Sequence, residues 1–260
     1  MRLNTICAIA SVVNKELYRR KDFYVLFILT VAITALAGSA NFFNDDKIVR
    51  YLKELCLLFI WIASLVVAIT MAARQIHAER ENRTIFPLLA KPVSRAEVVL
   101  GKFVGCWLAT GLALLCFYVF FTVVTAAREH EWPAAVLWQA VVSHWILLGI
   151  VIALTLLASL VFTAPSSTAT FCFIVTLGIL FMGRHLGKIA LPMPEPMHSW
   201  LYAVYFTIPQ LGFFDLRELV IHHHPAVGLQ DWLLALIYGA AYTAIFLCTA
   251  CAFFQRKPLN

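Results

Sequence analysis

The chain has 260 residues, of which 62% are hydrophobic and only 13% are charged. Soluble domains contain roughly 45–50% apolar and about 25% charged residues, so the composition excludes a soluble globular enzyme, a disordered protein and a free nucleic-acid-binding domain. The net charge of +6 does not indicate a nucleic-acid partner, because membrane proteins carry an excess of Lys and Arg on their cytoplasmic side. One membrane-spanning helix needs about 20 apolar residues. The sequence therefore predicts an all-α integral membrane protein embedded in a lipid bilayer, with room for six spans.

The chain begins with an amphipathic stretch, residues 1–22, which ends in a basic run and is expected to lie along the membrane surface as an interfacial helix. Apolar runs then predict six transmembrane helices at about 23–43, 52–73, 103–127, 134–162, 168–183 and 232–254. The segment 184–231 is the longest connection, is rich in aromatic residues and is interrupted at Pro209. Since proline interrupts helices, one or two interfacial or re-entrant helical pieces are expected there before the sixth span.

The distribution of basic residues predicts the orientation of these spans. With six spans, both chain termini and the connection 74–102 lie on one side of the membrane, and this side carries 13 of the 20 Lys and Arg residues. Short cytoplasmic segments are enriched in Lys and Arg. We therefore expect cytoplasmic termini, a cytoplasmic segment 74–102 and an extracytoplasmic segment 184–231.

The cytoplasmic segment 74–102 is much longer than a connection between two spans requires. Ser94 and Glu97 have the S-x-x-E spacing of a capping box, so the third span is expected to begin as a helix near Arg95, before it enters the membrane. The second span is expected to continue outward, which would give a helical hairpin. Its tip is apolar and rimmed by charged residues, which is typical of a docking surface. A hairpin packed on itself, or lying on the membrane surface, is the alternative.

Few charged side chains fall within the expected spans. His144, with Gln139 and Ser143 nearby, is the best candidate for a buried polar cluster, which would either form interhelical hydrogen bonds or contact a substrate. Gly101 and Gly105 lie four residues apart on one helix face, where small residues let another helix approach closely. We interpret them as packing residues, with a dimer contact or the substrate path as candidate locations.

His222, His223 and His224 form a metal-like pattern in the sequence. Neutral imidazole binds zinc and copper, but adjacent residues point in different directions, and no Cys, Asp or Glu stands at ligand spacing. An exposed loop without metal is therefore the preferred interpretation. No Walker A pattern is present, so we do not expect this chain to hydrolyse ATP by that route.

The cytoplasmic segment also carries a longer pattern: an acidic residue, Thr, an apolar pair, Leu, Pro-Val-Ser-Arg, apolar residues and Gly-Lys. The matching residues are Glu79 or Glu81, Thr84, Ile85, Phe86, Leu88, Leu89, Pro92, Val93, Ser94, Arg95, Val98, Val99, Leu100, Gly101 and Lys102. This pattern resembles that of the ABC-2 type permeases of ABC transporters. Members of that family often have Gly before the Thr, where this chain has Arg83.

The resemblance implies a membrane subunit of an ABC exporter in the bacterial inner membrane that is not itself an enzyme. The chain would pair with a second copy or a related permease and bind two copies of an ATPase subunit, which would use ATP and Mg, while the permease itself would bind no cofactor. An extracytoplasmic subunit is a further candidate partner. The contact with the ATPase would involve residues of the hairpin, namely Glu79, Glu81, Arg83, Thr84, Phe86 and Leu88.

The apolar spans favour a hydrophobic or amphipathic substrate. Two other functions stay open. The chain could transmit ATPase-driven motion to an extracytoplasmic partner without moving a solute. It could also be an intramembrane enzyme that uses His144 or the three consecutive histidines, although the sequence offers no matching set of acid, base and nucleophile.

Overall fold

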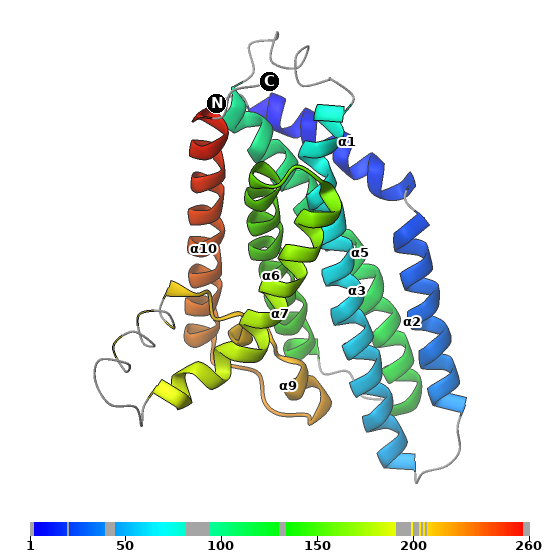
Figure 1. Ribbon diagram of the computed structural model, residues 1–260. Coiled ribbons are helices and arrows are strands. Elements are labelled where there is room, and N and C mark those ends of the chain that lie inside the picture. The colour runs from blue at the N-terminus through cyan, green and yellow to red at the C-terminus, as the bar shows by residue number, and fades with distance from the viewer. Residues whose placement is uncertain are drawn as a thin grey trace.

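The computed structural model describes residues 3–19, 21–39, 45–81, 94–129, 134–190 and 207–256, together with Ser199, Ala203 and Tyr205. All the longer regular elements in this part of the chain are helices (Figure 1). In chain order they are α1 (Leu3–Arg19), α2 (Lys21–Ser39), α3 (Asp45–Glu81), α5 (Arg95–Glu129), α6 (Ala134–Val161), α7 (Pro165–Ala190), the 3₁₀ helix η1 (Leu211–Phe214), α9 (Arg217–Ile221) and α10 (Leu229–Arg256).

Four helices, α3, α5, α6 and α10, are long and apolar enough to cross a membrane. The helices α2 and α7 contain shorter apolar stretches, Phe23–Ala35 and Pro165–Phe181. The 37 residues of α3 give a helix about 55 Å long at 1.5 Å per residue, which exceeds the roughly 30 Å hydrocarbon core of a bilayer. The prediction of an all-helical membrane protein is confirmed, and α3 is long enough to project beyond the membrane.

The long helices run lengthwise beside one another, and both chain termini lie at the same end of this bundle (Figure 1). We call this the terminal end, and the opposite one the far end. Helix α1 runs obliquely across the terminal end, whereas α2 follows the long axis. The spans of α3 and α6 are the most enclosed, with 67% of each window buried, whereas only 17% of the α10 window is buried. The centre of the bundle is therefore built around α3 and α6, and α10 lies at its periphery.

Two tryptophans lock α5 to α6. The indole N–H of Trp107 donates to the main-chain oxygen of Trp145 at 3.0 Å, and the indole of Trp145 donates to the main-chain oxygen of Trp107 at 3.0 Å. The rings stack with their centroids 4.3 Å apart. Gly111 and Gly149 make room for these rings, because a Cβ at Gly111 would lie 2.5 Å from the Trp145 indole nitrogen and one at Gly149 would lie 3.1 Å from that of Trp107. Indole donors buried in an apolar bundle need such partners.

The connection between α7 and α10 differs from the expected loop 184–231. Helix α7 continues to Ala190, and α10 already begins at Leu229. The helix bounds and the expected span bounds need not coincide, because falling hydropathy marks the edge of the apolar core, whereas a helix continues wherever its backbone bonds remain satisfied. The short helices η1 and α9 fold back against the far end of the bundle, where Leu211, Phe214 and Val220 are buried.

Candidate functional site

A charged pair joins α3 to α5 at the terminal end. The Lys102 ammonium lies 2.5 Å from a carboxylate oxygen of Glu79, and their side chains are only 10% and 14% exposed. An ion pair so little exposed is held more firmly than a surface pair, because removing one partner leaves an uncompensated buried charge. The pair therefore fixes the spacing of the two helices at the point where they leave the bundle. Lys102 belongs to the sequence pattern described above, and Glu79 is one of its two acidic candidates.

The start of α5 is set by reciprocal capping bonds. The main-chain N–H of Glu97 donates to the Ser94 hydroxyl at 3.2 Å, and the main-chain N–H of Ser94 donates to the Glu97 carboxylate at 2.9 Å. These bonds satisfy two of the amides that a helix start leaves without partners. The remaining expected contact residues of the hairpin lie outside the described residues or have side chains that do: Glu81, Arg83, Thr84, Phe86 and Leu88.

Arg95, the first residue of α5, reaches the end of α10. One guanidinium nitrogen, Nη1, donates to the main-chain oxygens of Phe254 at 2.8 Å and Gln255 at 3.2 Å. Sequence reasoning did not identify this contact. The sequence does show that Arg95 is a cation at a helix start, where the helix dipole is unfavourable to a positive charge. Its partner Phe254, however, lies 159 residues away in the chain, and nothing in the sequence links the two residues.

Gly101 and Gly105 form the surface of α5 on which α1 packs most closely. A Cβ at Gly101 would lie 2.8 Å from the Cβ of Ile9, and one at Gly105 would lie 2.7 Å from the Cβ of Val13 and 3.0 Å from the Cα of Ala10. The two glycines therefore serve close helix packing, as small residues do within membranes. Their partner in the structure is the N-terminal helix of the same chain.

The terminal end thus gathers three separate parts of the chain. The N-terminal helix α1 packs on α5, the charged pair holds α3 to α5, and the end of α10 is bound to the first residue of α5. All three contacts involve residues 95–105. We therefore call residues 95–105 the junction of the terminal end, because the contacts of α1, α3 and α10 meet there.

Gln139 ties the segment before α10 to α6 at the far end. Its side-chain amide donates to the main-chain oxygen of Val227 at 2.9 Å, and its side-chain oxygen accepts from the N–H of Val227 at 2.9 Å. One turn further along α6, the Ser143 hydroxyl accepts from the indole of Trp232 at 2.9 Å. Gln139 and Ser143 therefore anchor the chain where it enters α10, and they do not join His144 in a single cluster.

Loss of the two Gln139 hydrogen bonds is expected to make the segment around Val227 more mobile. In Gln139→Ala both polar groups of Val227 lose a well-formed partner, which costs roughly 1–3 kcal/mol for buried groups. Hydrogen exchange at the Val227 amide should accelerate, as measured by mass spectrometry of the purified protein. Gln230→Ala, at an exposed glutamine in the first turn of α10, is the control and should leave this rate unchanged. Equal rates in the two variants would contradict this role of the two hydrogen bonds.

His144 instead binds two other helices. Its Nε2 atom lies 2.9 Å from the Ser64 hydroxyl on α3, and its Nδ1 atom lies 3.4 Å from the Tyr118 hydroxyl on α5. The Ser64 hydroxyl also donates to the main-chain oxygen of Trp61 at 3.0 Å. A neutral imidazole with its proton on Nε2 satisfies the whole set, since Ser64 then accepts and Tyr118 donates. His144 therefore joins three helices, and it does not line the cavity described next.

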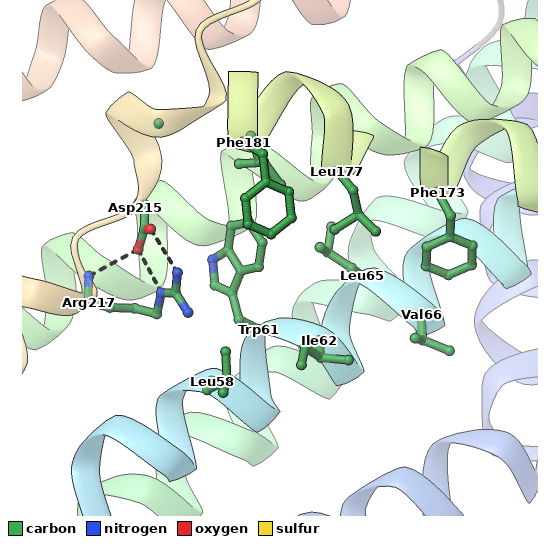
Figure 2. A pocket seen from close by; sticks show the side chains of 12 residues that line it. Leu58, Trp61, Ile62, Leu65, Val66, Phe173, Leu177, Phe181, Asp215 and Arg217 are labelled. Carbon is green, nitrogen blue, oxygen red and sulfur yellow. Dashed lines mark hydrogen bonds and ion pairs between the residues drawn. The ribbon is translucent and has the colours of Figure 1, made fainter. Parts of the chain in front are cut away.

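A cavity of about 600 Å³ lies between α3 and α7 (Figure 2). Its walls are almost entirely apolar, and polar side chains approach it only where η1 and α9 meet the bundle. Exposed lining side chains, such as Ile62 at 47% and Phe181 at 73%, show that it opens toward the outside of the bundle. The lining residues are Leu58, Trp61, Ile62, Leu65, Val66, Phe173, Leu177, Leu180, Phe181, Gly212, Asp215 and Arg217.

An ion pair lines the polar side of this cavity. The Arg217 guanidinium donates to both carboxylate oxygens of Asp215, at 2.8 and 2.9 Å, and its central carbon lies 4.8 Å from the centroid of a Trp61 ring (Figure 2). Hydrogen bonding to Asp215 raises the pKa of Arg217 above its ordinary value. The guanidinium therefore stays charged, and stacking on Trp61 adds a cation–π contact between α9 and α3. Sequence analysis missed this site, because Arg217 and Trp61 are far apart in the chain.

Two of the three consecutive histidines contact α3, and the rings of His222 and His224 lie with their centroids 5.8 Å apart. His222 lies 3.4 Å from a guanidinium nitrogen of Arg50, and His223 lies 3.0 Å from the ammonium of Lys53. Arg and Lys are hydrogen-bond donors only, so both imidazoles offer their Nε2 lone pairs to side chains of α3. Among the described residues, no group of three or more His, Cys, Asp or Glu is placed to hold a metal ion. These histidines are best described as contacts between the far-end loop and α3.

Comparison with known proteins supplies the family. A scan of protein-family models matches residues 11–259 to the family described as ABC-2 family transporter protein. A comparison with individually curated proteins finds no match. The matched region includes the junction at residues 95–105, the cavity and the end of α10, and it covers nearly the whole chain. The chain is therefore a multi-pass membrane protein that belongs to the ABC-2 family of transporter proteins.

Proposed function

We propose that this chain is the permease subunit of an ATP-driven ABC-2 type transporter that exports a hydrophobic or amphipathic substrate. The observation that carries this proposal is the junction at residues 95–105. There the residues of the family pattern, Gly101 and Lys102, hold the N-terminal helix and the base of the α3–α5 hairpin. A junction of this kind is what a permease needs in order to pass force from an external motor to its spans.

The proposed topology has six spans. Helices α2 and α7 would cross the membrane beside the four longer helices, since their 19 and 26 residues reach about 28 and 39 Å at 1.5 Å per residue. The excess of Lys and Arg near the terminal end would place both termini in the cytoplasm. The bacterial inner membrane is the proposed location, and α1 would lie along its cytoplasmic surface.

The motor would be a separate ATPase subunit present in two copies, which would bind ATP and Mg. Its docking site would be the hairpin tip between α3 and α5, with the charged residues of the hairpin setting the orientation of docking and the apolar residues providing contact area. The Glu79–Lys102 pair at the base would keep the two helices together as the tip is pushed.

The substrate would enter the cavity between α3 and α7. Its apolar walls suit an acyl chain or a ring system, and the Asp215–Arg217 pair at one side suits a polar group. Because the cavity opens to the outside of the bundle, a second permease copy packed against this face would enclose it. We therefore propose a dimer, either of this chain or with a related permease, with the transport path at the interface.

Purification from native membranes in a gentle detergent tests the proposal. Mass spectrometry of the co-eluting proteins should find a P-loop ATPase in an amount equal to that of the permease. The purified complex should hydrolyse ATP, and reconstituted complex should need ATP for transport. Recovery of the chain alone, in a state that functions without ATP, would overturn the proposal and favour an intramembrane enzyme or a passive channel.

Narrowing the cavity is expected to reduce substrate binding. Leu177→Trp adds bulk to the cavity wall on α7, and a steric cost of about 1–3 kcal/mol corresponds to roughly a 5- to 150-fold loss of affinity. The probe is a photoreactive amphiphile, an alkyl chain that bears a diazirine, and the measurement is its incorporation into α3 and α7 by peptide mass spectrometry. Leu234→Trp, on the exposed face of α10, is the control. Equal incorporation in both variants would show that the cavity does not bind amphiphiles.

A further inference from the structure

The positive charge of Arg95 is unfavourable at its position in its own helix. As the first residue of α5, it places a cation at the positive end of that helix dipole. Its guanidinium, however, donates to the main-chain oxygens of Phe254 and Gln255, which belong to the last turn of α10. Carbonyls in a last turn lack donors within their own helix, and the negative end of the dipole attracts a cation. The position of Arg95 is therefore explained by its contacts with α10 and not by its place in α5.

Phe254 strengthens this attachment. The centroid of its ring lies 5.6 Å from the central carbon of the Arg95 guanidinium, within the range of a cation–π contact. Although Phe254 is close to the end of its helix, it is only 3% exposed, because its side chain enters the base of the hairpin beside Glu79 and Lys102. Polar and apolar contacts thus hold the end of α10 to the hairpin.

The far half of α10 has a second attachment. The main-chain N–H of Gln210 donates to the hydroxyl of Tyr238 at 2.9 Å. Gly239 packs so closely on Phe214 that a Cβ there would lie 2.8 Å from the end of that ring. Gln210 and Phe214 belong to η1 and its N-cap, directly before the Asp215–Arg217 pair that lines the polar side of the cavity. Helix α10 therefore connects the base of the hairpin to the segment that carries this ion pair.

We propose that Arg95 is a positioning residue that transmits movement of the hairpin through α10 to η1 and to the Asp215–Arg217 pair that lines the cavity. The inference rests on the proposed function, since an ATPase must move the hairpin. Helix α10 suits this role because one continuous helix contacts the base of the hairpin at its last turn and η1 in its first half. Rigid secondary elements and the side chains packed on them carry coupling between distant sites.

The test measures the exposure of η1 while the hairpin is driven. Phe213, which is 58% exposed on η1, is replaced by cysteine in the complex of permease and ATPase in nanodiscs, and its labelling by a charged maleimide is quantified by mass spectrometry. We expect ATP and Mg to change the labelling rate. Adding Arg95→Ala should reduce this change by about fivefold or more, at the low end of typical coupling effects. Arg95→Lys, which keeps a charged donor, should retain most of it.

Arg256→Ala is the matched control, because it removes the same charge from an exposed position at the same end of α10. It should leave the ATP-dependent change intact. If Arg95→Ala cannot be purified, Phe254→Leu, which keeps an apolar side chain but removes the ring, should reduce the change in its place. An ATP response that survives both substitutions, or the absence of any response in the parent complex, would overturn the inference. Co-purification of the ATPase decides the proposed function separately, since neither substitution alters the hairpin tip.

Discussion

Replacing Lys102 with methionine is expected to destabilise the protein by up to about 3–5 kcal/mol, because the largely buried Glu79 carboxylate would lose its ion pair with the Lys102 ammonium. The side chains of the pair are only 10% and 14% exposed, so water cannot substitute for the ammonium as it would at a surface. The measurement is the thermal unfolding midpoint of the purified protein, and Lys102→Met should lower it by several degrees. An unchanged midpoint would contradict the buried pair.

The double variant Glu79→Leu/Lys102→Met separates stability from function. Apolar residues that replace both members of a buried ion pair are often neutral or stabilising, so the midpoint should recover much of what the single variant lost. The difference from additivity gives the interaction energy of the pair. If ATP-driven transport stays low when stability has recovered, the pair itself is needed for coupling. If transport recovers together with stability, the role of the pair is structural.

Gly105→Ala is expected to displace α1 from α5. The new methyl group would lie 3.0 Å from the Cα of Ala10 and 2.7 Å from the Cβ of Val13, so the backbone of α1 must move and not merely a side chain. Overpacking costs about 1–3 kcal/mol, which exceeds or cancels the gain of about 1 kcal/mol from alanine in a helix. Hydrogen exchange in α1 should accelerate, and Gly105→Leu should enlarge the effect.

Gly178→Ala provides the control, since nothing lies within 4 Å of a Cβ built at that position. This substitution should leave exchange in α1 unchanged and should keep or slightly raise the unfolding midpoint, because alanine favours the helix. If α1 in Gly105→Ala were as protected from hydrogen exchange as in the parent protein, the packing of α1 would not depend on Gly105. In the proposed transporter, loss of α1 should also weaken force transmission, because α1 and the hairpin meet on the same stretch of α5.

The candidate site could be anticipated only in part. The S-x-x-E spacing identifies the capping bonds of Ser94 with Glu97, because a cap involves residues within one turn of each other. The same sequence suggests one cluster around His144, but the structure separates it. His144 binds Ser64, 80 residues away, whereas Gln139 binds Val227, 88 residues away. Neighbours on a helix can face different partners, and nothing in their own sequence specifies which partner each one meets.

The sequence by itself determined the features that depend on composition and local spacing. Long apolar runs require a membrane and, within it, helices, because every backbone group must be paired inside its own segment. The start of α5 at Arg95 and the family pattern from Glu79 to Lys102 are also local. Each of these follows from residues within a few turns of one another.

Only the tertiary structure decided which helices meet. It placed α1 on Gly101 and Gly105, the end of α10 on Arg95, and Arg217 on Trp61. These contacts join residues far apart in the chain, and they depend on the fit of whole helix faces. Apolar residues on a membrane helix look alike whether they face lipid, a cavity or another helix, because lipid is as apolar as the core. The hydropathy pattern that identified the spans therefore could not show where they pack.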